Sequence, residues 1–162
     1  RQFDATLAHY EYRDLPADRA SDVTLVSGAF MLCRTDSLRA VGGFDERYFF
    51  FFEETDLAYA MKSAGWLVYQ VPDAMIYHLQ GQSIGRNVRS RIEFYRSRYQ
   101  FLRKWHDGVY LRVAAGIIFF RLLADTLLNG VGVILTLGMA EGLRQKLFTY
   151  LHILKWHFSS LR

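Results

Sequence analysis

The sequence predicts an α/β fold followed by apolar and amphipathic helices. Short apolar, β-branched runs bounded by Gly or Pro alternate with stretches of helical period between residues 23 and 105. A long apolar stretch follows at 113–140, and an amphipathic one at 141–162. The chain has 162 residues, 51% of them apolar and 16% aromatic, which is enough for one domain with a core.

Charge and cysteine content narrow the classes of partner and compartment. The net charge is +4 and the basic residues are clustered, which suits an anionic partner such as a phosphate ligand, a lipid headgroup or nucleic acid. The single cysteine, Cys33, excludes an internal disulfide framework and fits a reducing compartment. The sequence has no zinc-binding Cys/His pattern, no P-loop, no G-x-G-x-x-G and no Asp-x-Asp.

Residues 48–66 place three acids at the start of a predicted helix. Five aromatic residues run directly into Glu53 and Glu54, and Asp56 follows two positions later. One helical face is then formed by apolar residues at i, i+3, i+4 and i+7, namely Leu57, Ala60, Met61 and Ala64. Gly65 is placed to end this helix. Acids are common in a first helical turn, because the free N–H groups and the dipole there favour negative charge.

The aromatic neighbours make a catalytic interpretation of these acids possible as well. Desolvation beside four Phe side chains and repulsion between Glu53 and Glu54 would raise the pKa of one carboxyl. A raised pKa is how a general base is tuned towards neutral pH. The helix dipole acts in the opposite direction, and the sequence leaves the balance open.

Four further elements follow from local signals. Apolar runs predict a buried strand at 23–32 and short strands at 67–71 and 74–78. A short helix is expected at 34–43, with Asp36 as a capping residue and the Gly-Gly pair at its end. The polar residues 1–21 are expected to form a loop or connector.

Several short words occur in order between residues 25 and 85: VSGAF, GGFDE, an aromatic run before EETDL, and AGW. They resemble the acceptor-side half of the family 2 glycosyltransferases, particularly the rhamnosyltransferase-like branch. The family usually has Glu-Asp where this chain has Glu53 and Glu54. The second acid is the catalytic base of the family, so the resemblance assigns that role to Glu54, which is one methylene longer than Asp.

The resemblance also implies a pocket around this base. It places Ser27 and Gly28 near the acceptor and the donor sugar, although a glycine inside an apolar run can equally serve simple packing. Glu53 and Asp56 would shape the same pocket. Asp45, in the GGFDE word, is expected to be a turn or cap residue rather than a catalytic one.

His78 begins the stretch HLQGQSIG. A lone histidine at a strand end is commonly structural. The His-x-x-Gly-x-Ser wording, however, resembles the position of a metal ligand in the family, which implies that His78 helps to hold Mg²⁺ or Mn²⁺. The Gly-rich loop that follows could close over a diphosphate.

Residues 86–104 form a basic segment of helical period, with seven Lys or Arg and one acid, Glu93. An apolar stripe is made by Ile92, Tyr95, Tyr99 and Leu102, and Phe94 and Phe101 lie nearly opposite to it. One interpretation is that Arg86, Arg89 or Arg91 contacts the leaving diphosphate. The alternatives are a helix on anionic lipid headgroups and an ordinary solvated basic face. No recognition motif for nucleic acid is present.

The last third of the chain predicts helices associated with a membrane. The apolar stretch 113–140 contains Arg121 and Asp125, which could pair on a helix. One or two interfacial or re-entrant helices are expected there, with a true span or a buried helix pair as alternatives. An amphipathic, Trp-bearing helix of the interfacial type is expected at 141–162, and one side of it carries Leu143, Leu147, Leu151 and Leu154.

These expectations combine into one functional hypothesis. Residues 1–105 would be the C-terminal part of a GT-A catalytic domain, and 106–162 a membrane-associated tail. The resemblance implies inverting, metal-dependent transfer of a sugar from a nucleotide-diphosphate sugar to a hydroxyl of a glycan or lipid-linked acceptor. The reaction would serve cell-surface polysaccharide synthesis at the cytoplasmic face of the membrane. The donor-binding half, with its Asp-x-Asp, is expected upstream of Arg1. The alternative is a non-catalytic, membrane-associated basic module that binds anionic lipid or a partner protein.

Overall fold

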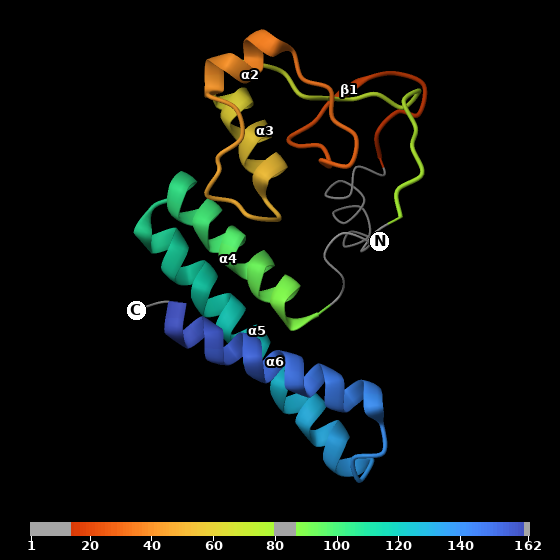
Figure 1. The fold of residues 1–162 in the computed structure, drawn as a ribbon, viewed down its shortest axis with the longest axis vertical. Helices are drawn as coiled ribbons and strands as arrows, with labels where there is room; N and C mark the ends of the chain where they lie inside the picture. The colour runs from red at the N-terminus through yellow and green to blue at the C-terminus, as the bar shows by residue number, and fades with distance from the viewer. Residues whose placement is uncertain (1–13, 80–86, 161–162) are drawn as a thin grey trace. The chain divides into compact units, whose positions relative to one another are not determined.

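The computed structural model describes residues 14–79 and 87–160, which fall into two compact units (Figure 1). Along the chain the elements are β1 (Ser21–Asp22), α2 (Thr35–Val41), α3 (Glu53–Ser63), β2 (Tyr69–Gln70), α4 (Val88–Trp105), α5 (Gly108–Leu135) and α6 (Glu141–Ser160). The first unit contains β1, α2, α3 and β2, and the second contains the aromatic segment Tyr48–Phe52 with α4, α5 and α6.

The sheet of the first unit is smaller than the sequence predicts. Strands β1 and β2 pair antiparallel, with Ser21 opposite Gln70 and Asp22 opposite Tyr69. The Val23 N–H extends this pairing by one bond of 2.8 Å to the Val68 carbonyl oxygen. The predicted strand at 67–71 is thus shortened to Tyr69–Gln70.

The predicted strands at 23–32 and 74–78 are wrong: both segments lack regular structure. A strand requires a hydrogen-bonded neighbour along its length. Within the described ranges, β1 and β2 pair only with each other. Several apolar residues of the two segments therefore remain exposed, among them Leu32 at 97% and Met75 at 87%.

Helix α2 confirms the predicted helix and its end. The C-terminal Gly42 has a left-handed backbone with φ 81°, and the Gly43 N–H donates to the Leu38 carbonyl oxygen at 2.9 Å. The predicted cap at Asp36 is wrong, because Arg34 is the N-cap residue and Asp36 lies inside the first turn. An acid in that turn still interacts favourably with the helix dipole.

Helix α3 begins at the predicted acids and ends at the predicted glycine. Gly65 has φ 85°, and the Trp66 N–H donates to the Met61 carbonyl oxygen at 3.0 Å, as in a Schellman motif. Leu57 and Met61 are buried as predicted, whereas Ala64 is exposed because it lies past the end of the helix.

A cross-link ties α3 to the sheet. The Lys62 ammonium lies 2.8 Å from a carboxylate oxygen of Asp22 and donates to the Val23 carbonyl oxygen at 2.9 Å. Lys62 holds the pKa of Asp22 below its ordinary value. These contacts fix the segment that follows β1 beside α3.

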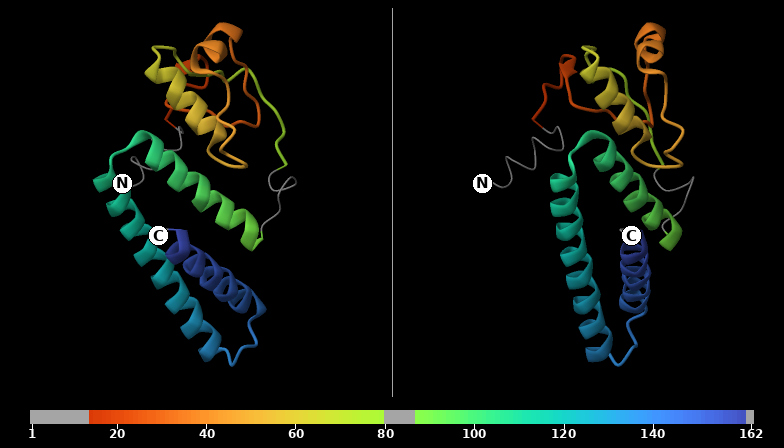
Figure 2. Two further views of the ribbon diagram at one scale, coloured as in Figure 1. Left: turned by 60° about the vertical axis from the view of Figure 1, so that its left-hand side comes forward. Right: turned by 90° about the vertical axis from the view of Figure 1, so that its left-hand side faces the viewer.

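The second unit is a group of three helices around one hydrophobic core. The buried core residues are Tyr99, Leu102, Ala115, Ile118, Leu122 and Ile153. Ile92 and Tyr95 pack against them, so the predicted apolar stripe of α4 is confirmed. In Figure 2, α5 and α6 run side by side in opposite directions. The predicted boundary at 105/106 falls between α4 and α5, which share this core.

Helix α5 is one continuous helix of 28 residues, and it begins before the predicted apolar stretch, at Gly108. The Asp107 carboxylate caps it by accepting the Tyr110 N–H at 2.7 Å. Arg121 and Asp125 form the predicted pair, with Nε and Oδ2 3.9 Å apart. By length and composition alone, α5 is able to cross a membrane.

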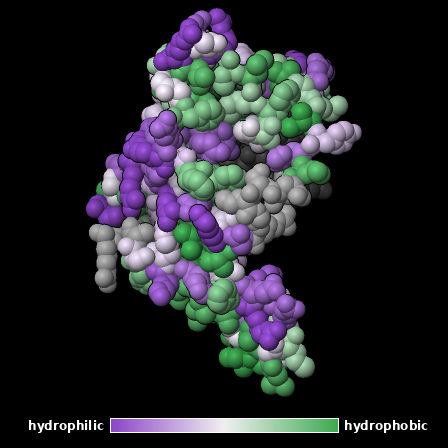
Figure 3. Space-filling view, in the orientation of Figure 1, coloured by the Kyte–Doolittle hydropathy of each residue, from purple (hydrophilic) through white to green (hydrophobic). Residues whose placement is uncertain are grey.

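The apolar surface of the second unit is extensive. Figure 3 shows hydrophobic side chains on the outside of α5 and α6, beside a hydrophilic cluster. The exposed apolar residues on α5 include Val113, Ile117, Phe120, Leu127, Leu128, Val131 and Ile134. On α6 the buried positions are Ile153 and His157, whereas Leu151 of the predicted stripe is 49% exposed. The other members of that stripe face the helix pair, because Leu154 packs against the core and Leu143 and Leu147 lie near Gly132 and Gly130 of α5.

Candidate active site

The paired acids Glu53 and Glu54 form the first turn of α3. Both side chains are partly buried, and the Oε2 atom of each is buried without a hydrogen-bond partner among the described residues. A buried carboxylate oxygen without a partner is costly, so such atoms are candidates for contact with a ligand. The pair thus presents two unused acceptors at a helix N-terminus.

The structure resolves the opposing influences on Glu54. Burial raises the pKa of Glu54 above its ordinary value, and the charge of Glu53 adds to this effect. The backbone N–H groups of Glu54 and Thr55 lower the pKa, but they do not outweigh burial. Desolvation therefore exceeds the effect of the helix N-terminus, and Glu54 has the shifted pKa that suits a general base.

The backbone just before the acid pair is in an uncommon conformation. Phe51 has φ 67° and Phe52 has φ 66°, both in the left-handed region that disfavours residues with a Cβ. Two such residues in succession cost about 1–3 kcal/mol each, so the surroundings must hold them. This pair of residues turns the chain directly into the first turn of α3.

Helix α4 holds this turn by a hydrogen bond. The Ser97 hydroxyl donates to the Phe50 carbonyl oxygen at 2.7 Å, and Ser97 is 2% exposed. A buried bond of this kind is worth about 1 kcal/mol, and leaving its acceptor unpaired costs more. Ser97 therefore restrains the residue immediately before the left-handed pair.

Ring contacts restrain the left-handed pair itself. The Phe51 and Phe94 rings are 5.5 Å apart between centroids and nearly perpendicular, at 82°. The Phe52 ring lies 5.6 Å from both Phe94 and Phe101. The second apolar side predicted for α4 thus receives the aromatic segment, and such ring pairs add about 0.5–1.5 kcal/mol each beyond burial.

Gly28 lies directly against Glu54. A Cβ placed on Gly28 would be 3.3 Å from the Cβ and 3.8 Å from the Cδ of Glu54. The segment after β1 can approach the base this closely because residue 28 has no side chain. The neighbouring Ser27 is exposed, and its hydroxyl accepts the Ala29 N–H at 3.3 Å. The structure therefore brings Gly28 and Glu54 together, whereas the predicted place of Ser27 and Gly28 near the acceptor and the donor sugar stays a prediction.

Asp45 makes hydrogen bonds within a turn, and Asp56 is buried in α3. The Asp45 Oδ1 atom accepts the Arg47 N–H at 3.1 Å and the Arg47 Nε–H at 2.8 Å, which confirms Asp45 as a turn residue. Asp56 is 2% exposed on the inner side of α3. The role of Asp56 in shaping a pocket stays a prediction.

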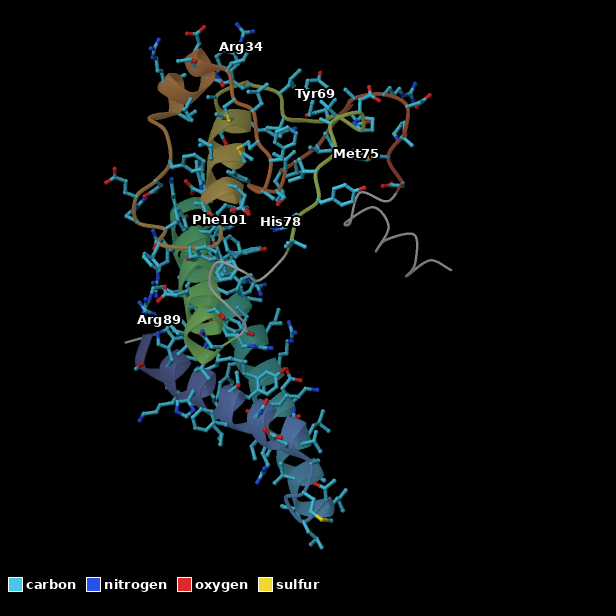
Figure 4. The ribbon with its side chains drawn as sticks, turned by 45° about the vertical axis from the view of Figure 1, so that its right-hand side comes forward. Arg34, Tyr69, Met75, His78, Arg89 and Phe101 are labelled. Atoms are coloured by element: carbon cyan, nitrogen blue, oxygen red, sulfur yellow. The ribbon has the colours of Figure 1, made fainter. Side chains whose placement is uncertain are left out.

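His78 does not lie in a metal site formed by described residues. It is exposed, on the non-helical segment that follows β2 (Figure 4). Within 14–79 and 87–160, no three His, Cys, Asp or Glu residues are grouped so that they could hold a metal ion. One imidazole is not a binding site by itself. Gly81 and Ser83, the other two residues of the His-x-x-Gly-x-Ser motif, lie outside the described residues.

The candidate phosphate-binding arginines lie at the start of the basic helix. Arg89 and Arg91 are exposed in the first turns of α4, where Figure 4 labels Arg89. Arg86 lies outside the described residues. Exposed guanidinium groups are available to a phosphate, but their role with a diphosphate stays a prediction.

Comparison with known proteins identifies the family. A model of the glycosyltransferase-like family 2 matches residues 3–96, which is more than half of the chain. The chain belongs to glycosyltransferase-like family 2. The matched region includes Gly28, the acid pair and the first half of α4.

Two curated relatives match part of this family 2 chain. Both are N-acetylglucosaminyl-diphospho-decaprenol L-rhamnosyltransferases of Mycobacterium tuberculosis, from strains CDC 1551 / Oshkosh and ATCC 25618 / H37Rv. Each is 38% identical over 104 residues, which is 64% of this chain and 33% of the relative. The chain thus spans about a third of the length of these relatives. No solved structure matches the chain.

Family membership confirms the resemblance to rhamnosyltransferase-like glycosyltransferases and implies a GT-A fold. The α/β class is therefore supported by family membership, although helices dominate the described residues and the sheet among them has two strands. The sequence motifs predicted roles for Glu54 and Gly28. They did not predict the left-handed backbone of Phe51 and Phe52, because a positive φ is normally expected at glycine and the run of Phe contains none.

Proposed function

We propose that this family 2 chain is the acceptor-side part of an inverting glycosyltransferase. It would transfer a sugar from a nucleotide-diphosphate sugar to a hydroxyl of a glycan or lipid-linked acceptor. One observation carries the proposal: Glu54 has a raised pKa and a buried, unpartnered Oε2 atom at the N-terminus of α3, against Gly28. A carboxylate in this state is a good acceptor for the proton of a hydroxyl.

In the proposed reaction Glu54 acts as general base. Its carboxylate takes the proton of the acceptor hydroxyl while that oxygen attacks the anomeric carbon of the donor. The bond from the anomeric carbon to the diphosphate oxygen breaks on the opposite face, so the configuration inverts and the proton ends on Glu54. Burial makes Glu54 a stronger base than an exposed glutamate, because desolvation disfavours its charged form.

The leaving diphosphate requires positive charge. Arg86, Arg89 and Arg91 are the candidates on this chain, since guanidinium groups form paired hydrogen bonds with phosphate oxygens. Mg²⁺ or Mn²⁺ is the proposed cofactor, and when bound it would neutralise charge on the diphosphate. The described surroundings of His78 do not by themselves form a site for this ion.

The acceptor is proposed by analogy with the substrates that the names of the two relatives state. These act on N-acetylglucosaminyl-diphospho-decaprenol and transfer L-rhamnose. By analogy, we propose a polyprenyl-diphosphate sugar as acceptor and L-rhamnose as the first donor sugar to test. The reaction would serve cell-surface polysaccharide synthesis at the cytoplasmic face of the membrane.

A membrane location is supported by the second unit. Helix α5 is long and apolar enough to cross a membrane, and most of its most apolar stretch is not buried. Exposed Phe120 and Leu128 on α5 would contact acyl chains. The same surface favours the second candidate function, a non-catalytic module that binds anionic lipid or a partner protein.

The deciding experiment changes Glu54 to Gln in the natural polypeptide. Transfer of labelled L-rhamnose from its nucleotide diphosphate to a polyprenyl-diphosphate N-acetylglucosamine should fall by about 10²–10⁴-fold, because Gln cannot accept the proton. Glu46→Gln, at an exposed position of the same unit, is the control and should retain transfer. If Glu54→Gln retains transfer, the base assignment is wrong.

A membrane assay separates the two candidate functions. Both Glu54→Gln and the parent protein should sediment with phosphatidylglycerol vesicles. A double change of Phe120 and Leu128 to Gln should weaken this sedimentation, since each side chain loses about 1.5–3 kcal/mol of burial. Vesicle binding by a parent protein that transfers no sugar would favour the non-catalytic module.

A further inference from the structure

A pocket between α4 and α6 lies within the second unit and is distinct from the acid pair of the first. Its volume is about 200 Å³, and it is lined by Arg96, Tyr99, Arg103 and Trp156. The first three residues are at i, i+3 and i+7 on α4, so they share one side of that helix. The two guanidinium groups thus border a space whose wall is aromatic.

Contacts of Tyr99 with Trp156 and His157 hold the aromatic wall of the pocket in place. The Tyr99 and Trp156 rings are stacked, with centroids 6.2 Å apart and an angle of 29° between the planes. The Tyr99 hydroxyl oxygen lies 2.9 Å from Nδ1 of His157, and both residues are 1% exposed. Because these contacts are buried, the shape of the wall exists before any ligand arrives.

An acid holds Arg96 in place. Arg96 Nη1 lies 2.5 Å from Oε1 of Glu93, which is itself buried at 7% exposed. The Arg96 side chain remains 55% exposed. A guanidinium has five N–H donors in a plane, so a bond to Glu93 leaves other donors for an anion.

We propose that this pocket binds the phosphate group of an anionic lipid. Two guanidinium groups beside an aromatic wall match a charged headgroup that continues into an apolar body. A lipid is favoured over a free phosphate because the wall beside the two guanidinium groups is aromatic, and because α5 of the same unit exposes Val113, Ile117 and Phe120 elsewhere on its surface. Trp156 also has the amphipathic character of residues found at membrane surfaces. The proposal does not depend on sugar transfer or on Glu54.

The test observes Trp156 directly. In neutral detergent, the indole N–H resonance that Trp156→Phe removes identifies this side chain in a proton–nitrogen NMR spectrum. Dihexanoyl phosphatidic acid, a short lipid with one phosphate monoester, should shift this resonance saturably. Dihexanoyl phosphatidylcholine and inorganic phosphate should each need at least about tenfold higher concentration, since each lacks part of the recognised chemistry.

Two matched variants test the arginines. Arg96→Gln with Arg103→Gln should weaken the binding of phosphatidic acid at least about tenfold, because charge-assisted hydrogen bonds are lost. Arg112→Gln with Arg144→Gln removes the same charge from exposed positions on α5 and α6 and should leave it unchanged. Equal losses in both pairs would mean general charge attraction and would overturn the pocket.

The remaining outcomes also decide the proposal. An unchanged Trp156 resonance at saturating phosphatidic acid would show that the pocket binds no lipid phosphate. An equal response to inorganic phosphate would assign the site to free phosphate and refute the lipid. Far-ultraviolet circular dichroism of each variant confirms that a loss of binding does not arise from unfolding.

Discussion

The hydroxyl of Ser97 donates a hydrogen bond of 2.7 Å to the carbonyl oxygen of Phe50. Ser97 lies in the middle of α4, whereas Phe50 is four residues before the proposed base Glu54. The two residues belong to the same compact unit. Helix α4, which shares a core with α5 and α6, thus holds the backbone of Phe50, shortly before the acid pair in the chain.

Ser97→Ala should lower transfer more than it lowers substrate binding. The change removes the bond to Phe50 and releases the left-handed Phe51 and Phe52, so Glu54 would occupy its productive position less often. We expect kcat to fall by about tenfold with little change in KM for the donor. The free energy of unfolding should fall by about 1–3 kcal/mol.

Two variants distinguish positioning by Ser97 from a general loss of stability. Ser159→Ala removes a similar bond, from a hydroxyl to the Trp156 carbonyl oxygen at 2.8 Å on exposed α6, and should leave kcat unchanged. Ser97→Thr keeps the hydroxyl and should restore most of kcat. If Thr fails to restore activity while the protein remains folded, the hydrogen bond is not what positions the base.

Glu54→Gln should stabilise the protein at neutral pH although it abolishes transfer. The pKa of Glu54 is raised in the folded state, so the folded protein binds more protons than the unfolded chain between the ordinary value of 4.5 and the raised value. Stability therefore falls as pH rises through this window, and the charged Glu54 remains unfavourable above it. Gln carries no charge and escapes this cost.

Thermal melting across pH measures this effect. The advantage of Glu54→Gln should be full at pH 7 and should shrink as pH falls towards 4.5, where the parent carboxyl is protonated as well. Glu46→Gln, at an exposed site, should show no such trend. A destabilised Glu54→Gln at pH 7 would contradict the raised pKa.

Gly28→Ala tests how closely the segment after β1 must approach the base. The added Cβ would lie 3.3 Å from the Cβ of Glu54, so one of the two must move by a few tenths of an ångström. Displacement of a catalytic group on this scale should lower kcat several-fold. Gly142→Ala is the control, because a Cβ there meets nothing within 4 Å and should stabilise α6 by about 0.5–1 kcal/mol. Unchanged kcat in Gly28→Ala would show that this approach is not required.

The helices could be predicted from the sequence because their signals are local. Glycines at 42 and 65 end α2 and α3. The apolar residues that recur with helical period in α4 pack in the core of the second unit. The strands could not be predicted in the same way, since a strand depends on a partner that is distant in sequence. The run 23–32 has strand composition but forms no regular strand, and Leu32 within it is 97% exposed.

The residue types alone predicted which chemical groups the candidate site contains, but not their burial or their partners. Two adjacent carboxylates after four Phe indicated a base, and the family resemblance placed Gly28 near the acceptor and the donor sugar. The sign of the pKa shift of Glu54 required the burial that only the fold supplies. The role of Ser97 was invisible, because a serine inside a basic helix gives no sign of its distant partner Phe50.

His157→Gln should remove an acid-sensitive contribution to the stability of the three helices. Burial lowers the pKa of His157 below its ordinary value of 6.5. As pH falls below 6.5, the unfolded chain therefore takes up a proton that the folded protein does not, and stability falls. Tyr99, whose pKa burial raises to about 12, stays protonated and keeps its contact with Nδ1.

Melting temperatures between pH 7.5 and 5.5, on the order of one unit either side of the histidine pKa, measure this contribution. The parent should lose stability on acidification, and His157→Gln should lose less, because Gln can accept the Tyr99 hydroxyl without titrating. His152→Gln, an exposed change on the same helix, should follow the parent curve. Parallel curves for the parent and His157→Gln would mean that another group responds to acid, and the buried pair of Tyr99 and His157 would then be a purely structural contact.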